Sequence, residues 1–408
     1  ISHRAALIAA LASGRSEIAN FSTARDCAST VACLRELGVS IEQTDQQLIV
    51  AGTGKLVAPD RPLDCGNSGS TLRILTGVLA GHDLTAELIG DESLSSRPMR
   101  RIIEPLELMG TKIESTEGKA PLKVHGSAQL SPITYKLPVA SAQVKSAILF
   151  AGLNATGRTT VIETSPSRDH TERLFNGFGV PVETDGLSVS IQGPARLTGG
   201  AITIPGDVSS AAYFVAAAML LPGSDLIIER VGLNPTRAAF LDVLRSWGAE
   251  ISVSDVESER NEPFGTIRVR GGINRSASER ERTLSGSMIP ALIDELPLLA
   301  VVGSQIDGGI QIRDARELRL KESDRLATTA TNLRAMGAEV EEFEDGLAVA
   351  GPTKLRGTLV DSHLDHRIAM AFSVAALLAT GETQIAGSEC VAISFPEFFS
   401  LLYSLAVR

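Results

Sequence analysis

The amino-acid sequence predicts an α/β protein that is built from repeated units and divided into two domains. Three observations support this prediction: a length of 408 residues, a helix–glycine–strand pattern that recurs along the chain, and Ala-rich helical segments between its copies. One ordinary domain holds roughly 100–200 residues, so this length favours two domains. Alternation of helices with strands is typical of α/β folds, in which helices pack against sheets.

The recurring pattern is a helical segment that ends in glycine and continues into β-branched residues. The glycine stands at Gly38, Gly110, Gly179, Gly248 and Gly337. Glycine after the last helical turn adopts the left-handed conformation that other residues reach only at a cost, and β-branched residues favour a strand. We expect a sixth copy to end near Leu405. We also expect these helices to be amphipathic and to lie on the outside.

A second set of helices is rich in alanine and is expected to be buried, because small residues let a helix pack closely on all sides. These helices are predicted within residues 4–14, 71–81, 144–157, 209–223 and 366–381, and strands at 159–163 and 225–229. A sixfold repeat over this length suggests three units in each domain. Because residues 205–208 are rich in turn formers, we predict a first domain of 1–206 and a second domain of 207–408.

Composition narrows the function. The formal net charge is −10 and the pI is about 5.3, which disfavours a nucleic-acid partner because such a partner requires a broad basic surface. A local basic site for a small anion is compatible with this total. Four scattered cysteines are typical of a reduced, cytoplasmic protein. No apolar run reaches the roughly 18–20 residues of a membrane span.

Two polar segments in the first half indicate anion binding. Residues 65–73 form a small-residue turn that opens a helix, where free N–H groups and the helix dipole suit a phosphate or carboxylate. A plain helix cap explains the same residues. Arg97, Arg100 and Arg101 stand at the start of another helix, where the dipole disfavours cations. Either an anionic ligand or a solvated basic face accounts for them.

The third buried helix opens with residues 141–146, whose Ser, Gln and Lys side chains can hydrogen-bond a ligand hydroxyl or phosphate. Lys145 is one of these candidates. Residues 167–173 have a similar character. Within them, we favour i,i+4 pairing on the protein surface for Glu172 and for Arg173.

Acidic residues dominate the candidates of the second half. Asp294 and Glu295 lie in a strongly apolar stretch, where paired acids are costly unless they are functional or well bonded. Only one of them need point inward. Lys321 and Arg325 are four residues apart and are predicted to share one helical face, with Glu322 beside it. A salt-bridged, exposed helical turn is the alternative.

Basic residues recur at the starts of the buried helices. Arg4, Arg73, Lys145 and Arg367 all stand at or near such a start. Surface charge alone does not explain this recurrence. A shared anionic ligand does, because helix N-termini attract anions.

These segments resemble the enolpyruvyl transferase family and, within it, the bacterial 3-phosphoshikimate 1-carboxyvinyltransferases. The motifs follow the family's order over essentially the whole chain, at residues 1–4, 66–69, 97–99, 141–146, 168–172, 234–237, 321–325 and 365–367. The resemblance implies two domains of three βαβαββ units each, an inside-out α/β barrel with buried parallel helices and solvent-facing sheets. It also implies that helix N-termini of both domains face a cleft between them.

The resemblance implies a role for individual residues. Shikimate 3-phosphate would be bound by Arg4, Ser141, Ala142, Gln143, Arg168, Asp294 and Lys321. Phosphoenolpyruvate would be bound by Gly69, Arg97, Gln143, Arg325 and Arg367. Asp294 would accept the proton of the attacking 5-hydroxyl, and Glu322 would carry a proton to and from the methylene carbon. No metal and no cofactor is implied.

The resemblance further implies a cytoplasmic monomer in chorismate and aromatic amino acid biosynthesis, with glyphosate as inhibitor. The small Gly69 predicts glyphosate sensitivity, whereas Ala142 is typical of a subgroup with tolerant members. A strand and a Lys-Ser pair are expected before Ile1. The chain departs from the family at a C-terminal Lys, where it has Ile393 or Ser394, and at an Asn, where it has Glu317.

Two other functions are compatible with parts of this sequence. An enolpyruvyl transferase that uses UDP-N-acetylglucosamine shares the fold but typically has a reactive cysteine on a mobile loop, and residues 97–101 contain none. A non-catalytic anion-binding scaffold would have no need of Asp294 and Glu322 beside the arginines.

Overall fold

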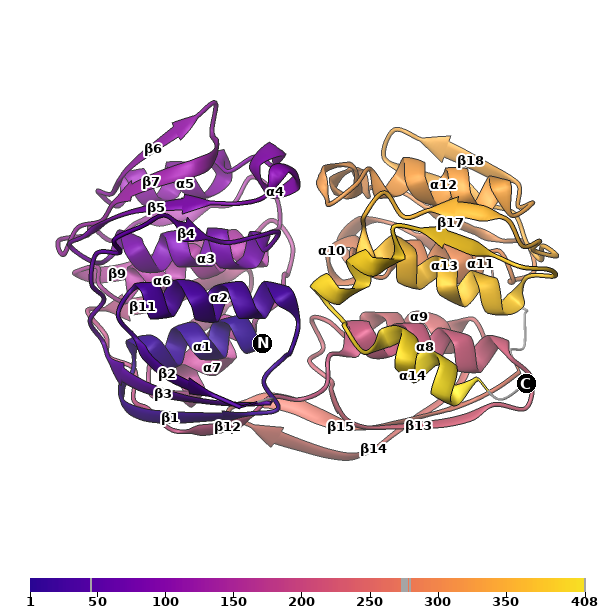
Figure 1. The fold of residues 1–408 in the computed structure, drawn as a ribbon, viewed down its shortest axis with the longest axis horizontal. Coiled ribbons are helices and arrows are strands. Elements are labelled where there is room, and N and C mark those ends of the chain that lie inside the picture. The colour runs from indigo at the N-terminus through magenta and orange to yellow at the C-terminus, as the bar shows by residue number, and fades with distance from the viewer. Residues whose placement is uncertain (45, 273–277, 279, 407–408) are drawn as a thin grey trace. The chain divides into compact units, whose positions relative to one another are not determined.

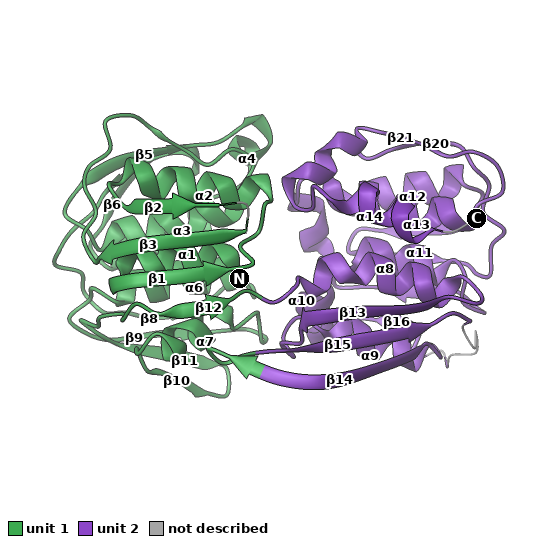
Figure 2. Ribbon diagram, turned by 60° about the horizontal axis from the view of Figure 1, so that its bottom comes forward, with its two compact units in different colours: residues 1–204, 258–262 green, residues 205–257, 263–408 purple. Residues whose placement is uncertain are grey.

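The computed structural model describes residues 1–406 except 45, 273–277 and 279. The chain divides into two compact units, residues 1–204 with 258–262 and residues 205–257 with 263–408 (Figure 2). The predicted junction after residue 206 lies two residues beyond the division between 204 and 205. Residues 258–262, which we predicted to lie in the second domain, belong to the first unit.

The first unit contains three inner helices and three outer helices (Figure 1). Nearly every residue of the inner helices is buried, as predicted from their small side chains: α1 (Ser2–Leu11), α3 (Gly69–Ala80) and α6 (Ala142–Gly152). The outer helices bury only one face: α2 (Arg25–Glu36), α5 (Arg100–Leu108) and α7 (His170–Gly177). A short helix, α4 (Glu92–Ser96), precedes α5.

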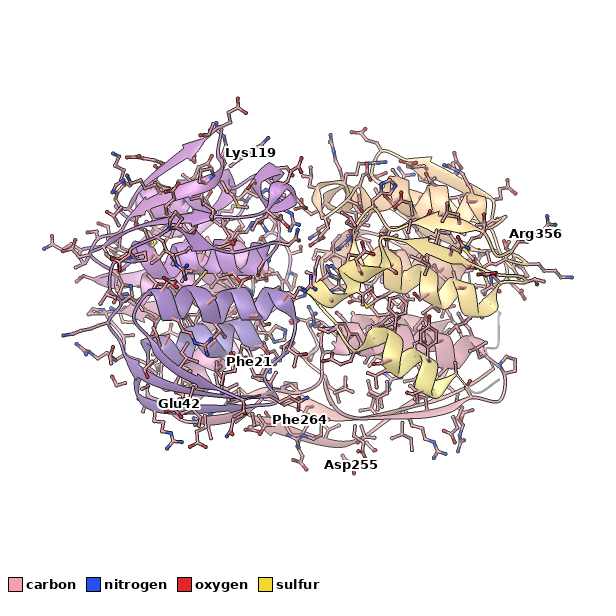
Figure 3. The ribbon with its side chains drawn as sticks, in the orientation of Figure 1. Phe21, Glu42, Lys119, Asp255, Phe264 and Arg356 are labelled. Atoms are coloured by element: carbon pink, nitrogen blue, oxygen red, sulfur yellow. The ribbon has the colours of Figure 1, made fainter. Side chains whose placement is uncertain are left out.

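Each sheet of the first unit combines one parallel pair with one antiparallel hairpin. The strand orders are β12-β1-β3-β2, β4-β5-β7-β6 and β10-β11-β9-β8. The strands are β1 (Ser13–Ala19), β2 (Ser40–Gln43), β3 (Gln47–Thr53), β4 (Leu63–Asp64), β5 (Thr85–Ile89), β6 (Lys112–Thr116), β7 (Lys119–His125), β8 (Thr134–Lys136), β9 (Gly157–Ile162), β10 (Val182–Asp185), β11 (Ser188–Gly193) and β12 (Ala201–Thr203). Charged side chains such as Glu42 and Lys119 extend from these strands into solvent (Figure 3).

The second unit repeats the plan. Its inner helices are α8 (Val208–Leu220), α11 (Leu296–Gly303) and α13 (His366–Leu378), and its outer helices are α9 (Ala239–Ser246), α12 (Arg325–Ala335) and α14 (Phe398–Leu405). We did not predict α11 among the inner helices, because its sequence is rich in Leu and Val rather than Ala. It follows the short elements η1 (Gly286–Met288) and α10 (Ile289–Leu292). The helix α14 ends at Leu405, as the repeat predicts.

The sheets of the second unit are less complete within the described residues. Their strand orders are β13-β15-β14, β16-β17-β19-β18 and β20-β21. The strands are β13 (Asp225–Gly232), β14 (Glu250–Glu259), β15 (Glu262–Arg270), β16 (Thr283–Leu284), β17 (Ile310–Ile312), β18 (Val340–Phe343), β19 (Gly346–Val349), β20 (Leu359–Asp361) and β21 (Gln384–Ala386). Two 3-10 helices, η2 (Arg316–Leu320) and η3 (Ser388–Ile393), complete the unit.

Glycine has two distinct uses in this fold. The five glycines of the recurring pattern follow helix ends with φ angles from 82° to 105°, which confirms their predicted left-handed conformation. Gly77 instead permits a close helix contact: a Cβ there would lie 2.2 Å from the carbonyl oxygen of Ala147 in α6 and 2.5 Å from its Cα. The inner helices α3 and α6 therefore pack backbone against backbone.

No single helix among the described residues is both long and apolar enough to cross a bilayer, although one bent pair of helices, Gly286–Leu292 with Leu296–Gly303, is.

Replacement of Gly77 by alanine is expected to lower the free energy of unfolding by about 2 kcal/mol, because α3 and α6 must separate to admit the methyl group. Gly337→Ala is the control: its φ is 97° but a Cβ would meet no atom within 4 Å, so only backbone strain of about 1 kcal/mol applies. Urea unfolding followed by circular dichroism measures both. Equal losses in the two variants would contradict the close packing.

Candidate active site

In the first unit, the start of α3 brings together several predicted anion ligands. Ser68 caps this helix, and its Oγ accepts a hydrogen bond from the Thr71 N–H at 3.1 Å. At Gly69, a Cβ would lie 2.8 Å from Nη1 of Arg73 and 3.4 Å from Nη1 of Arg97. The absent side chain thus leaves room for two guanidinium groups at a helix N-terminus, an arrangement that suits an anion.

Gln143 connects the starts of two inner helices. Its Oε1 accepts a hydrogen bond from Nη1 of Arg73 at 2.7 Å, and its Nε2 donates to Oγ of Ser70 at 3.0 Å. Ser141 caps α6 by accepting a hydrogen bond from the Val144 N–H at 3.4 Å. The structure therefore places Gln143 beside Gly69 and Arg73, as a shared ligand site requires.

The three clustered arginines have different environments. Arg97 follows α4, is buried, and donates from Nη2 to Oδ1 of Asn67 at 2.9 Å and to Oγ of Ser93 at 3.1 Å. Arg100 is exposed and Arg101 is half-buried. Arg97 lies against the start of α3, where its Nη1 would be 3.4 Å from a Cβ at Gly69.

Arg4 lies between α6 and α7. Its Nε donates to Oγ1 of Thr171 at 2.8 Å, its Nη2 donates to Oγ of Ser146 at 3.1 Å, and these two hydroxyl groups are 2.7 Å apart. Arg168 is half-buried and precedes Thr171 by three residues. The two hydroxyl groups therefore hold the Arg4 side chain against the segment that carries Arg168.

Lys145 does not have the role predicted from sequence. Its Nζ lies 2.9 Å from Oε2 of Glu163 and 2.6 Å from Oε1 of Glu172, and all three side chains are buried. The predicted i,i+4 surface pairing is confirmed for Arg173, whose Nε lies 2.9 Å from both carboxylate oxygens of the partly exposed Asp169. It is wrong for Glu172, which is buried and pairs with Lys145 instead. Helix spacing alone did not reveal that Glu172 faces α6.

A hydrogen-bond network links the starts of α1, α2 and α3. His3 Nδ1 lies 2.7 Å from Oγ1 of Thr30, which lies 2.7 Å from Oγ1 of Thr71, and His3 Nε2 lies 3.0 Å from Oδ2 of Asp26. Burial alone lowers the pKa of His3, but Cys27 and Asp26 raise it to about 10. A protonated His3 therefore adds positive charge next to Arg4.

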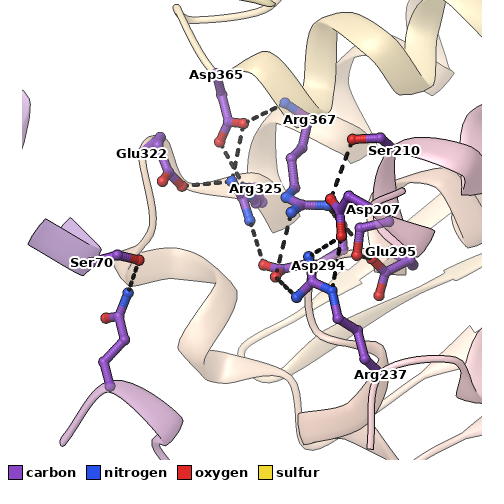
Figure 4. A network of polar contacts seen from close by, with 12 residues as sticks. Ser70, Asp207, Ser210, Arg237, Asp294, Glu295, Glu322, Arg325, Asp365 and Arg367 are labelled. Atoms are coloured by element: carbon purple, nitrogen blue, oxygen red, sulfur yellow. Dashed lines mark hydrogen bonds and ion pairs between the residues drawn. The ribbon is translucent and has the colours of Figure 1, made fainter. Parts of the chain in front are cut away.

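In the second unit, three arginines surround the Asp294 carboxylate (Figure 4). Oδ1 lies 3.5 Å from Nη1 of Arg325, and Oδ2 lies 3.5 Å from Nη2 of Arg367 and 4.0 Å from Nη1 of Arg237. Glu295 is buried instead, accepts a hydrogen bond from Ser209, and lies 3.5 Å from Nη1 of Arg367. Asp294 is the member of this acidic pair that remains accessible.

Arg325 is fixed by two carboxylates. Its Nε donates to Oδ2 of the fully buried Asp365 at 2.7 Å, and its Nη2 donates to Oε2 of Glu322 at 2.5 Å. Burial alone lowers the pKa of Arg325, but Asp365 and Glu322 raise it above its ordinary value. The Asp365 carboxylate also accepts the Arg367 N–H at 2.9 Å, so it caps α13.

Lys321 and Arg325 do not share a helical face, contrary to our prediction. Lys321 has an extended backbone after η2, and α12 begins only at Arg325 because Asp324 caps it. Burial lowers the pKa of Lys321. Among the residues that the structure describes, its ammonium group has no hydrogen-bond or ion-pair partner, so it is available to an anion.

Asp365 is the main residue that sequence reasoning missed. It belongs to the motif at 365–367, from which the sequence predicts no role for it. Its position was a usable signal, because Asp before an Ala-rich helix is a favoured N-cap. Its contact with Arg325, 40 residues away in sequence, could not be read from that position.

The fold and these side chains define an α/β repeat protein with cation-rich helix ends and paired carboxylates. The EPSP synthase (3-phosphoshikimate 1-carboxyvinyltransferase) family model matches residues 1–402. The chain is 51% identical over 410 residues to a 3-phosphoshikimate 1-carboxyvinyltransferase of Koribacter versatilis, covering 100% of this chain and 95% of the relative. It is 48% identical over 411 residues to the enzyme of that name from Geobacillus kaustophilus, covering 99% and 95%.

The fold is shared as well. A solved structure of EPSP synthase from Acinetobacter baumannii matches with a TM-score of 0.87 at 39% identity, over 100% of this chain and 93% of that one. The chain therefore belongs to the EPSP synthase family. The two-domain fold of repeated α/β units that the sequence resemblance implied is confirmed.

Asp365→Asn is expected to lower the free energy of unfolding by about 3 kcal/mol, because it removes the fully buried one of the carboxylates that pair with the buried Arg325. Asp225→Asn is the control, since Asp225 forms an exposed ion pair with Arg268 and its loss should have no measurable effect. Chemical unfolding of both variants provides the test. An Asp365→Asn protein as stable as the control would contradict the role of this ion pair.

Proposed function

We propose that this protein transfers the carboxyvinyl group of phosphoenolpyruvate to the 5-hydroxyl of shikimate 3-phosphate and releases phosphate. Membership of the EPSP synthase family supports this activity. The observation that carries its chemistry is that two carboxylates contact one guanidinium: Asp294 at 3.5 Å and Glu322 at 2.5 Å from Arg325. Arg325 can thus bind the anionic substrate, while the two carboxylates beside it can exchange protons with that substrate.

The two carboxylates have different tasks in this proposal. Asp294 accepts the proton of the 5-hydroxyl as that oxygen attacks phosphoenolpyruvate. Glu322 gives a proton to the methylene carbon, which yields a tetrahedral intermediate, and takes a proton back as phosphate leaves. The two carboxylates can divide the proton transfers in this way only if their environments differ. Asp294 faces three guanidinium groups at 3.5 to 4.0 Å, whereas Glu322 contacts Arg325 from the loop before α12.

Shikimate 3-phosphate is proposed to bind mainly to the first unit. Its ligands are Arg4, Ser141, Ala142, Gln143 and Arg168, with Asp294 and Lys321 from the second unit. Phosphoenolpyruvate is proposed to bind Gly69, Arg97, Gln143, Arg325 and Arg367. Arginine is suited to both substrates because its planar fork binds carboxylate and phosphate through two hydrogen bonds.

The two alternatives have less support. A UDP-sugar enolpyruvyl transferase typically exposes a reactive cysteine, whereas Cys27, Cys33, Cys65 and Cys390 are all buried. A thiol in such surroundings is a poor nucleophile. A non-catalytic scaffold does not account for two acids placed on one arginine.

The substrate can be identified directly. The full-length gene product is mixed with phosphoenolpyruvate and either shikimate 3-phosphate or UDP-N-acetylglucosamine, and phosphate release is measured. We expect release only with shikimate 3-phosphate. Release only with the sugar nucleotide would overturn the proposal, and release with neither would favour the scaffold.

We also propose that the protein acts as a cytoplasmic monomer in chorismate biosynthesis.

Glu322→Gln is expected to bind both substrates but to lose turnover by at least ~10²-fold, because an amide cannot carry the proton. Glu344→Gln is the matched control, since Glu344 forms an exposed ion pair with Arg316 in the same unit. Steady-state kinetics with equilibrium binding separates the two effects. Near-normal turnover of the Glu322 variant would remove Glu322 from its role.

Glyphosate is proposed to inhibit the enzyme at the phosphoenolpyruvate site. Gly69→Ala should then raise the inhibitory concentration of glyphosate at least about tenfold, or about 1.4 kcal/mol, because the new methyl group crowds Arg73 and Arg97. The KM for phosphoenolpyruvate should rise less. An unchanged inhibitory concentration would show that glyphosate does not bind beside Gly69.

A further inference from the structure

The cluster of Lys145, Glu163 and Glu172 takes no part in the proposed chemistry, yet its burial is costly. The three side chains are between 1% and 7% exposed. Isolated charges in such surroundings are strongly disfavoured, so a buried cluster of two anions and one cation needs good geometry to persist. Its ion-pair distances are short, since both carboxylates lie within 3 Å of the same ammonium nitrogen.

The ammonium group of Lys145 has three close oxygen neighbours. Its nitrogen lies 2.9 Å from Oε2 of Glu163, 2.6 Å from Oε1 of Glu172 and 3.4 Å from the carbonyl oxygen of Ser167. The contacts with Glu163 and Ser167 are hydrogen bonds, and the contact with Glu172 is an ion pair. Because the nitrogen is buried among these oxygen atoms, Lys145 is not placed to meet a substrate, despite its place in the first turns of α6.

The partners of Lys145 delimit one segment of the chain. Glu163 directly follows β9, Ser167 donates from its Oγ to Oε1 of Glu163, and Glu172 lies in the first turn of α7. Between them the segment carries Arg168, and it also carries Thr171, to which Arg4 donates. One lysine on α6 thus holds both ends of a segment that carries Arg168 and contacts Arg4.

We propose that Lys145, with Glu163 and Glu172, is the positioning element of the shikimate 3-phosphate half of the site. It locks residues 163–172 to the start of α6, where Ser141 to Gln143 lie. This inference rests on the proposed function and deepens it. Lys145 touches no substrate, and it acts through the placement of Arg4 and Arg168 relative to α6.

The charge states agree with this role. Burial alone lowers the pKa of Lys145, but Glu172 and Glu163 raise it above its ordinary value, so the ammonium stays charged. Burial raises the pKa of Glu172 against the opposing effect of Lys145. Without the lysine, two buried carboxylates would face each other, and the segment would have to open to reach water.

The test replaces the cluster rather than one member alone. Lys145→Met leaves two unpaired acids and is expected to destabilise the fold. The triple variant Lys145→Met, Glu163→Gln, Glu172→Gln removes every charge and keeps similar volumes, so it keeps the inference testable. The matched control is Arg158→Met with Glu183→Gln, an exposed ion pair on β9 and β10 of the same unit.

For the folded triple variant we expect the KM for shikimate 3-phosphate to rise at least about tenfold, with kcat at saturation reduced less than about threefold. The KM for phosphoenolpyruvate and all constants of the control should stay near those of the parent protein. An unchanged KM for shikimate 3-phosphate, or an equal rise in both KM values, would overturn the inference. A parent protein without turnover on shikimate 3-phosphate would overturn the proposed function instead.

Discussion

The inner helices of each unit begin at the same end, and the rest of the site depends on this constraint. In the first unit, Gln143 at the start of α6 contacts the start of α3, and Arg4 at the start of α1 contacts Ser146 of α6. In the second unit, Ser209 of α8 contacts Glu295 before α11. Helix dipoles that point the same way create positive potential where these first turns meet.

Two lysines show how local surroundings decide the use of one residue type. Lys145 and Lys321 both lie in motifs near helix starts, and both are candidates for anion binding by sequence. Two carboxylates and a carbonyl group surround the ammonium of Lys145. Within the part of the chain that the structure describes, Lys321 has no such contact, and burial lowers its pKa. The first can only organise its surroundings, whereas the second can meet an anion.

Much of the fold could be predicted because its determinants are local. The left-handed glycines, the Ala-rich inner helices and the repeat itself follow from short-range conformational preferences. The inner helix α11 escaped this reasoning because bulky Leu and Val residues fill its place. The ion pairs of Glu172 and Asp365 also escaped, since their partners are 27 and 40 positions away, as the sequence numbers show, and only packing brings them together.

The tip of the hairpin between β14 and β15 belongs to the first unit, although the chain on both sides of it belongs to the second. There His170 Nδ1 lies 2.7 Å from Oε1 of Glu262, and both residues are buried. During synthesis on a ribosome, the first unit therefore cannot be completed until residues 258–262 have been made, some 55 residues after residue 204. A gene fragment cut at residue 206 encodes most of the first unit but lacks this tip.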